Sequence, residues 1–257
     1  MVHLEINKNI IDNIELVIFD KDGTLVDLYN YWANMINFRV ESAQRKMGFN
    51  ESNKIDIMYA MGVDVENGRL RSEGPVGLKK REIVMQAMVD SLAEIGFSDT
   101  YDTCFQIFKE VDEQSINHLD DIVKPVNGMH GLIDSLYEKE CKIAIATTDK
   151  TARADLAADF LGISDRVNMV VGEDMVANCK PHPDMANLIL KELSVDKERS
   201  IVVGDAITDI EMGLNAGLKA SIGVCSGLTS ERKLREKTDY IIEDISSSCN
   251  QVAVLNK

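Results

Sequence analysis

Two aspartates stand one residue apart directly after a short apolar run, in the sequence Leu16-Val17-Ile18-Phe19-Asp20-Lys21-Asp22-Gly23-Thr24. The run is rich in branched side chains, which predicts a buried strand. Because alternate residues of a strand point to the same side, Asp20 and Asp22 are expected to emerge together at its end. Two such carboxylates repel each other and lose hydration unless a cation lies near them. The pattern favours a divalent metal, a bound phosphate, or both, although an ordinary turn would explain Asp22 and Gly23 alone.

Polar residues also follow the later apolar runs of the chain. The runs that predict strands are 142–146, 167–171, 200–203 and 220–224, with 240–242 as a last short edge strand. Thr147 follows the first of these, Lys180 lies in the loop after the second, and Asp205 follows the third, with Asp209 nearby. Ligands of open α/β sheets bind outside the carboxyl ends of the strands. We therefore expect these side chains to gather at one edge of the sheet.

Helical patterns alternate with these strands at residues 151–161, 183–193 and 209–216. This alternation predicts an α/β fold, in which a mainly parallel sheet is covered on both faces. Residues 28–124 break the rhythm and carry amphipathic stretches near 28–48, 52–61, 79–95 and 99–117. The glycine-rich segment 62–77 between them is expected to be a loop or a small hairpin. The predicted domains are an α/β core, 1–27 and 125–257, and an inserted helical cap, 28–124.

The insertion begins a few residues after the first strand, and so beside the carboxyl ends of the strands. A helical module in that place is expected to act as a lid over the site. The role of residues 1–14 is left open, as either an extra edge strand or a tether.

Composition and charge exclude several classes of protein. The formal charge of −15 at pH 7 disfavours sequence-independent binding of nucleic acid and of anionic membranes. Five cysteines without a CxxC pair indicate free thiols in a reducing compartment. No signal peptide and no apolar run of membrane-spanning length is visible. We expect a soluble, cytoplasmic protein with a small-molecule partner, and its oligomeric state is left open.

Four segments, taken in order, resemble the four motifs of the haloacid dehalogenase superfamily. They are Asp20-Lys21-Asp22-Gly23-Thr24, Thr147, Lys180-Pro181, and Gly204-Asp205 with Asp209. Because the helical insertion falls between the first two motifs, the chain resembles the subgroup with an α-helical cap. That subgroup includes phosphoglycolate phosphatase and β-phosphoglucomutase. The resemblance implies a Rossmann-like core and a magnesium-dependent phosphatase.

The chemistry of the matched residues is consistent with those roles. Asp20 is expected to attack phosphorus and form an aspartyl-phosphate. Asp22 is expected to protonate the leaving alcohol and then to act as base for the attacking water. Magnesium prefers oxygen ligands, which suits the Asp20 carboxylate, the backbone carbonyl of Asp22, and Asp205. These three residues are the predicted metal site.

The remaining matched residues are expected to bind the phosphoryl group. Lys180 is expected to neutralise one phosphoryl oxygen, and Thr147 to donate a hydrogen bond to another. Asp209 is expected to orient Lys180 or a metal-bound water from behind. The predicted substrate is a small phosphorylated metabolite, with phosphoglycolate first and sugar phosphates next.

Other functions within and outside the superfamily remain open at this point. A phosphomutase of the β-phosphoglucomutase type uses the same core, and no core motif separates the two. A phosphonatase needs a Schiff-base lysine in the cap, where Lys79 or Lys80 would be available. A dehalogenase has no need for Asp22, and a catalytically silent binding module has no need for the whole set. The chain has neither the GxxxxGK[ST] loop of nucleotide kinases nor the GxSxG elbow of serine hydrolases.

Overall fold

The structure is a computed structural model that describes residues 1–6, 9–71, 73–77, 79–246 and 254–255. The chain divides into two compact units. The core unit consists of Met1–Leu28 with Pro125–Lys257, and the helical unit is Tyr29–Lys124.

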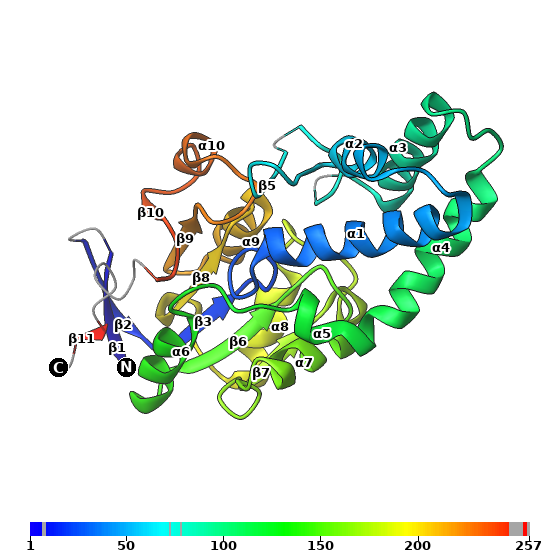
Figure 1. Cartoon of the computed structure of the whole chain (residues 1–257). Coiled ribbons are helices and arrows are strands. Elements are labelled where there is room, and N and C mark those ends of the chain that lie inside the picture. Colours follow the sequence, from blue (N-terminus) through cyan, green and yellow to red (C-terminus); the bar gives the residue numbers. More distant parts are fainter. Residues whose placement is uncertain (7–8, 72, 78, 247–253, 256–257) are drawn as a thin grey trace. The chain divides into compact units, whose positions relative to one another are not determined.

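The core unit is built on a six-stranded parallel sheet with the strand order β10-β9-β8-β3-β6-β7 (Figure 1). Its strands are β3 (Leu16–Phe19), β6 (Lys142–Ala146), β7 (Met169–Val171), β8 (Ser200–Gly204), β9 (Ala220–Val224) and β10 (Tyr240–Ile242). All four residues of β3 are buried, which explains why its sequence is continuously apolar instead of alternating. The predicted α/β class with a mainly parallel sheet is confirmed, and β7 begins two residues later than the run at 167–171.

Helices surround this sheet. They are α6 (Met129–Glu138), α7 (Thr151–Phe160), α8 (Asp184–Leu193), α9 (Ile207–Ala216) and α10 (Glu231–Arg235), with the short 3-10 turns η2 (Glu173–Met175) and η3 (Lys197–Arg199). The apolar side of α8, including Met185 and Ile189, belongs to the same buried cluster as Leu16 and Ile18 of β3. In the ladder, Phe19 pairs with Ile145 of β6 and with Val203 of β8. The carboxyl ends of these three strands therefore stand level.

Strands from residues 2–6 and 9–14 form part of a second sheet. Strands β1 (Val2–Ile6) and β2 (Asn9–Ile14) make an antiparallel hairpin, and β1 also pairs with β11 (Val254–Leu255). Strands β1 and β2 are therefore not extra edge strands of the parallel sheet, because they join neither of its edges. The reason lies in β1, where Val2, Leu4 and Ile6 alternate with less buried residues and need an apolar surface. Leu4 lines the same small apolar pocket as Phe19 of β3 and Leu132 of α6.

The helical unit contains α1 (Leu28–Met47, which begins at the last residue of the core unit), α2 (Glu51–Met61), α3 (Arg81–Glu94), α4 (Tyr101–Gln114), η1 (Ser115–His118) and α5 (Leu119–Ile122). Strands β4 (Val63–Asp64) and β5 (Arg69–Leu70) form a small hairpin in the segment expected to be a loop or hairpin. Gly62 ends α2 with φ 113°, a conformation that favours glycine. Within the described residues, no helix is long and apolar enough to cross a membrane.

Candidate active site

The predicted site residues of the core unit follow the level ends of β3, β6 and β8. Asp20 is the first residue after β3, and its backbone N–H donates to the carbonyl of Val203 at 2.9 Å. One carboxylate oxygen each from Asp20, Asp205 and Asp209 lie within 4.8 Å of one another. Lys180 joins this group from the loop before α8, with Nζ 2.6 Å from Asp20 Oδ1 and 2.6 Å from Asp209 Oδ1. The structure thus brings together residues that lie up to 189 positions apart in the sequence.

Lys180 is a buried cation, because its side chain is 2% exposed. Two of its three N–H groups donate to the carboxylates of Asp20 and Asp209. Burial by itself lowers the pKa of a lysine, but the carboxylates of Asp20 and Asp209 outweigh that effect and raise the pKa of Lys180. Asp209, in the first turn of α9, uses both of its oxygens. Oδ1 accepts from Lys180 and Oδ2 accepts from the backbone N–H of Ala206 at 3.0 Å. Asp209 therefore holds Lys180 in place.

The two remaining carboxylates have more negative charge around them than Lys180 offsets. Burial raises the pKa of Asp20 to about 6, against the opposing effect of Lys180. Burial, followed by the charges of Asp20 and Asp209, raises the pKa of Asp205 well above its usual value. Among the described residues, no side chain donates a hydrogen bond to Asp205. A second cation would relieve this repulsion, and a cluster of carboxylate oxygens is the donor set that suits Mg²⁺.

Two glycines leave room for the Asp205 carboxylate. A Cβ atom at Gly23, where φ is +91°, would lie 2.7 Å from Asp205 Cγ, and one at Gly227 would overlap the carboxylate outright. Ser226 links the loop after β9 to the loop after β3, because its hydroxyl donates to the Gly23 carbonyl at 2.7 Å. Sequence reasoning missed Ser226 and Gly227. They follow β9, so the rule that ligands bind at the carboxyl ends of strands could have found them.

Thr147 directly follows β6 and is 1% exposed. Its hydroxyl oxygen accepts from the backbone N–H of Asp149 at 3.1 Å. Within the described part of the chain, the hydroxyl proton of Thr147 meets no acceptor, so it remains available for a ligand.

Asp22 lies apart from the buried group of carboxylates. Its side chain is 29% exposed, and its Oδ1 accepts a hydrogen bond from Lys21 Nζ at 2.6 Å. Asp22 is absent from the group whose carboxylate oxygens lie within 4.8 Å, which is compatible with the predicted contact through its backbone carbonyl. Lys21, to which sequence reasoning gave no role, is nearly as buried as Lys180.

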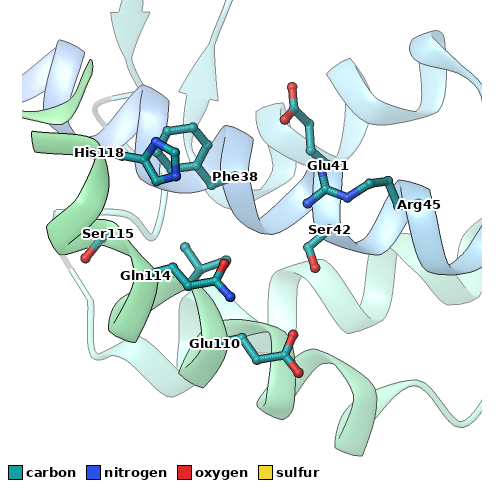
Figure 2. Close-up of a pocket in the computed structure, with 9 residues that line it drawn as sticks. Phe38, Glu41, Ser42, Arg45, Glu110, Gln114, Ser115 and His118 are labelled. Carbon is teal, nitrogen blue, oxygen red and sulfur yellow. The ribbon is translucent and has the colours of Figure 1, made fainter. Parts of the chain in front are cut away.

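The helical unit has a pocket of its own, shown in Figure 2. This cavity of about 190 Å³ lies between α1 and the segment formed by α4 and η1. Its lining consists of Phe38, Glu41, Ser42, Arg45, Glu110, Val111, Gln114, Ser115 and His118. Glu41 is already paired with Lys54 at 3.1 Å, and Glu110 with Lys46 at 3.1 Å. None of the six predicted site residues lines this pocket.

A model of the haloacid dehalogenase-like hydrolase family matches residues 14–217. The chain belongs to this family. The family resemblance predicted from the four motifs is thereby confirmed. The match runs from the last residue of β2 to one residue beyond α9 and so includes every predicted site residue.

Two curated bacterial relatives are similar over part of their length. "Pyrophosphatase PpaX" of Listeria monocytogenes is 30% identical over 135 residues, which are 52% of this chain and 62% of the relative. "Probable phosphatase IndB" of Dickeya dadantii is 34% identical over 105 residues, 41% of this chain and 45% of the relative. The matches therefore span less than two thirds of these relatives. PpaX of Oceanobacillus iheyensis aligns more fully, at 24% identity over 91% of this chain and 94% of its own.

Solved structures share the fold at low sequence identity. A structure from Thermotoga maritima that carries a β-phosphoglucomutase assignment has a TM-score of 0.66 at 22% identity, covering 92% of this chain and 97% of its own. A predicted phosphoglycolate phosphatase from Haemophilus somnus has a TM-score of 0.68 at 19% identity, covering 93% and 98%. These likenesses establish the Rossmann-like fold of the family.

Proposed function

We propose that this protein is a magnesium-dependent phosphatase that hydrolyses a small phosphorylated metabolite through an aspartyl-phosphate at Asp20. The observation that carries the proposal is the buried group in which Lys180 bridges Asp20 and Asp209 beside Asp205. A phosphoryl group brings several negative charges, and its transfer depends on positioned cations and an in-line nucleophile. This group supplies the nucleophile and one cation. Its three carboxylates carry more negative charge than Lys180 neutralises, so a second cation would be favoured there.

In this proposal the described side chains divide the reaction between them. Lys180 holds Oδ1 of Asp20, so Oδ2 is the oxygen left to attack phosphorus. Asp22, partly exposed beside the site, protonates the leaving oxygen and afterwards takes a proton from the attacking water. Lys180 and the Thr147 hydroxyl bind phosphoryl oxygens. Asp209 keeps the Lys180 ammonium in position.

The donor set fits a magnesium ion held by the carboxylates of Asp20 and Asp205 and by the backbone carbonyl of Asp22. When bound, the ion would neutralise charge on the transferring phosphoryl group. Asp209 is the third member of the carboxylate group, but each of its oxygens already accepts a hydrogen bond, one from Lys180 and one from the Ala206 N–H. We therefore assign Asp209 to the support of Lys180.

The comparisons with known proteins suggest candidate substrates that the geometry of the site alone does not. Phosphoglycolate is the first candidate and sugar phosphates are the next, since the fold is shared with structures carrying those assignments. Inorganic pyrophosphate is added because relatives from Listeria and Oceanobacillus are named pyrophosphatases. A phosphomutase remains the second candidate. It uses the same groups, but returns the phosphoryl group to a sugar before water attacks.

A substrate panel tests the proposal. We expect phosphate release from at least one of phosphoglycolate, sugar phosphates and pyrophosphate, dependent on added Mg²⁺ and lost in Asp205→Asn. A sugar 1-phosphate supplied with its bisphosphate distinguishes the mutase, which would yield the isomeric sugar phosphate without net phosphate release. Hydrolysis at full rate after exhaustive chelation would contradict the proposal, as would full activity in Asp205→Asn.

A further inference from the structure

Lys21 lies between the two aspartates of the first motif, yet its side chain is only 5% exposed. A buried ammonium group is costly unless it is paired and hydrogen-bonded. The chain keeps this charge at the very end of the central strand, beside the proposed acid and base. Such a charge could serve the fold alone, but Lys21 contacts Asp22, the proposed acid and base of the reaction.

The Lys21 ammonium lies between carboxylates from two strand ends. Nζ donates to Asp22 Oδ1 at 2.6 Å and lies 3.6 Å from Oδ2 of Asp149, which belongs to the loop after β6. Asp149 is itself fixed from other sides. Arg153 Nε is 3.5 Å from the same Oδ2, and Oδ1 accepts from the backbone N–H of Lys150 at 2.9 Å. Lys21 thus links the Asp22 carboxylate to a loop that is anchored independently.

We propose that Lys21, held by Asp149, is a positioning residue that fixes the Asp22 carboxyl group for proton transfer to the leaving oxygen. The inference rests on the proposed function. Asp22 is partly exposed and would rotate freely without an anchor. Lys21 holds Oδ1, while Oδ2 has no partner among the described residues and is the oxygen that carries the transferable proton. Correct placement of such a group is worth orders of magnitude in rate.

The step that Lys21 supports is the formation of the aspartyl-phosphate. The bond from Asp20 Oδ2 to phosphorus forms as the ester P–O bond breaks. The electron pair of that ester bond stays with the leaving oxygen, which takes the proton from Asp22 Oδ2. Asp22 is left as a carboxylate, and Lys21 remains protonated throughout. A weakly basic leaving group departs without this proton, whereas a more basic one needs it.

Aryl phosphates separate this role from a merely structural one. We compare kcat/KM for p-nitrophenyl phosphate and phenyl phosphate, which share a ring but differ in leaving-group basicity, using the magnesium-loaded full chain. In Lys21→Met we expect phenyl phosphate to lose about tenfold more activity than p-nitrophenyl phosphate, within the range of general acid catalysis. Asp149→Asn should shift the ratio in the same direction by less. Lys191→Met, on the exposed surface of α8, is the matched control and should leave the ratio unchanged.

A double mutant completes the test. On an Asp22→Asn background, Lys21→Met should produce no further change in the ratio, because the group it positions is gone. An equal loss on both esters in Lys21→Met and in Asp149→Asn would overturn the inference and leave the proposed phosphatase standing. If Lys21→Met does not fold, the ratio in Asp149→Asn decides. Failure of the unmodified protein to hydrolyse these esters and every compound of the substrate panel would overturn the proposed function together with the inference.

Discussion

At the scale of single residues, Lys180 is the group on which the site depends. It donates to two carboxylates at once and is shielded from water, so it offsets charge that would otherwise repel within the core unit. Removing one partner of a buried ion pair leaves the other charges uncompensated, which is more damaging than the pair is beneficial.

Lys180→Met is therefore expected to lower the free energy of unfolding of the metal-free protein by about 3–5 kcal/mol at neutral pH. Phosphatase activity should fall by about 10²-fold or more, since a phosphoryl-binding cation is lost as well. Chemical denaturation and steady-state assays measure the two effects. A variant as stable as the parent would show that Asp20 and Asp209 do not depend on this ammonium group.

Gly227 provides a second test at this scale. Because an added Cβ would overlap the Asp205 carboxylate, Gly227→Ala should displace that group and raise the Mg²⁺ concentration for half-maximal activity at least about tenfold. Gly131→Ala is the matched control, since nothing lies within 4 Å of the added atom in helix α6. An unchanged magnesium requirement in Gly227→Ala would contradict the role of Asp205 as a ligand.

At the scale of elements, the helical unit is tied together by a cluster of charges around the buried side chain of Arg39. Arg39 of α1 and Arg81 of α3 both bind Asp112 of α4, at 2.8 and 2.7 Å. The Arg39 guanidinium also lies 4.2 Å from the centroid of the Phe108 ring. Asp112 is thus the common anion for two arginines on different helices.

Asp112→Ala should destabilise the helical unit by about 3–5 kcal/mol, because the buried Arg39 then lacks its anion. Trp32 is the one tryptophan of the chain and lies in α1, so its fluorescence reports the unfolding of this unit. Glu113→Ala, at the exposed neighbouring position of α4, is the control and should change stability by less than about 1 kcal/mol. Equal unfolding midpoints for the two variants would contradict this assignment.

Sequence patterns located most of these elements because each has a strong local signal. Strands β6 and β9 begin and end at the residues that their apolar runs predicted, 142–146 and 220–224, because buried parallel strands are continuously apolar. The sheet of β1, β2 and β11 was not foreseen, because β1 pairs with a segment that lies far away in the sequence. Lys21 escaped notice for a similar reason. Its partner Asp149 lies in the loop after β6, far from Lys21 in the sequence. Without that contact, a lysine is expected to be exposed to solvent.

At the scale of the whole molecule, stability and pH are linked through Asp20, and the proposed function links metal binding to both. Its pKa is raised from 3.8 to about 6 in the folded, metal-free protein. The folded state therefore binds this proton more tightly than the unfolded state does. Ionisation of Asp20 costs no stability below about pH 4, and the cost grows until about pH 6, above which it is complete.

Under the proposed function, Mg²⁺ would compete with that proton for the same carboxylate. The rise in Tm on adding Mg²⁺ should consequently be several degrees at about pH 7.5 and much smaller at about pH 5. Thermal unfolding at both pH values measures it, and Asp205→Asn should abolish most of the rise. A rise that is equal at the two pH values would contradict binding at these carboxylates.

The central claim is that Asp20 is the nucleophile of a metal-dependent phosphatase, and the most direct test is the hydrolysis of p-nitrophenyl phosphate by Asp20→Asn. With saturating Mg²⁺, the parent chain and Lys191→Met should release phosphate at the same rate. Asp20→Asn, and the parent chain after chelation of metal, should each retain about 10⁻³ of that rate or less. Undiminished hydrolysis by Asp20→Asn would contradict the account.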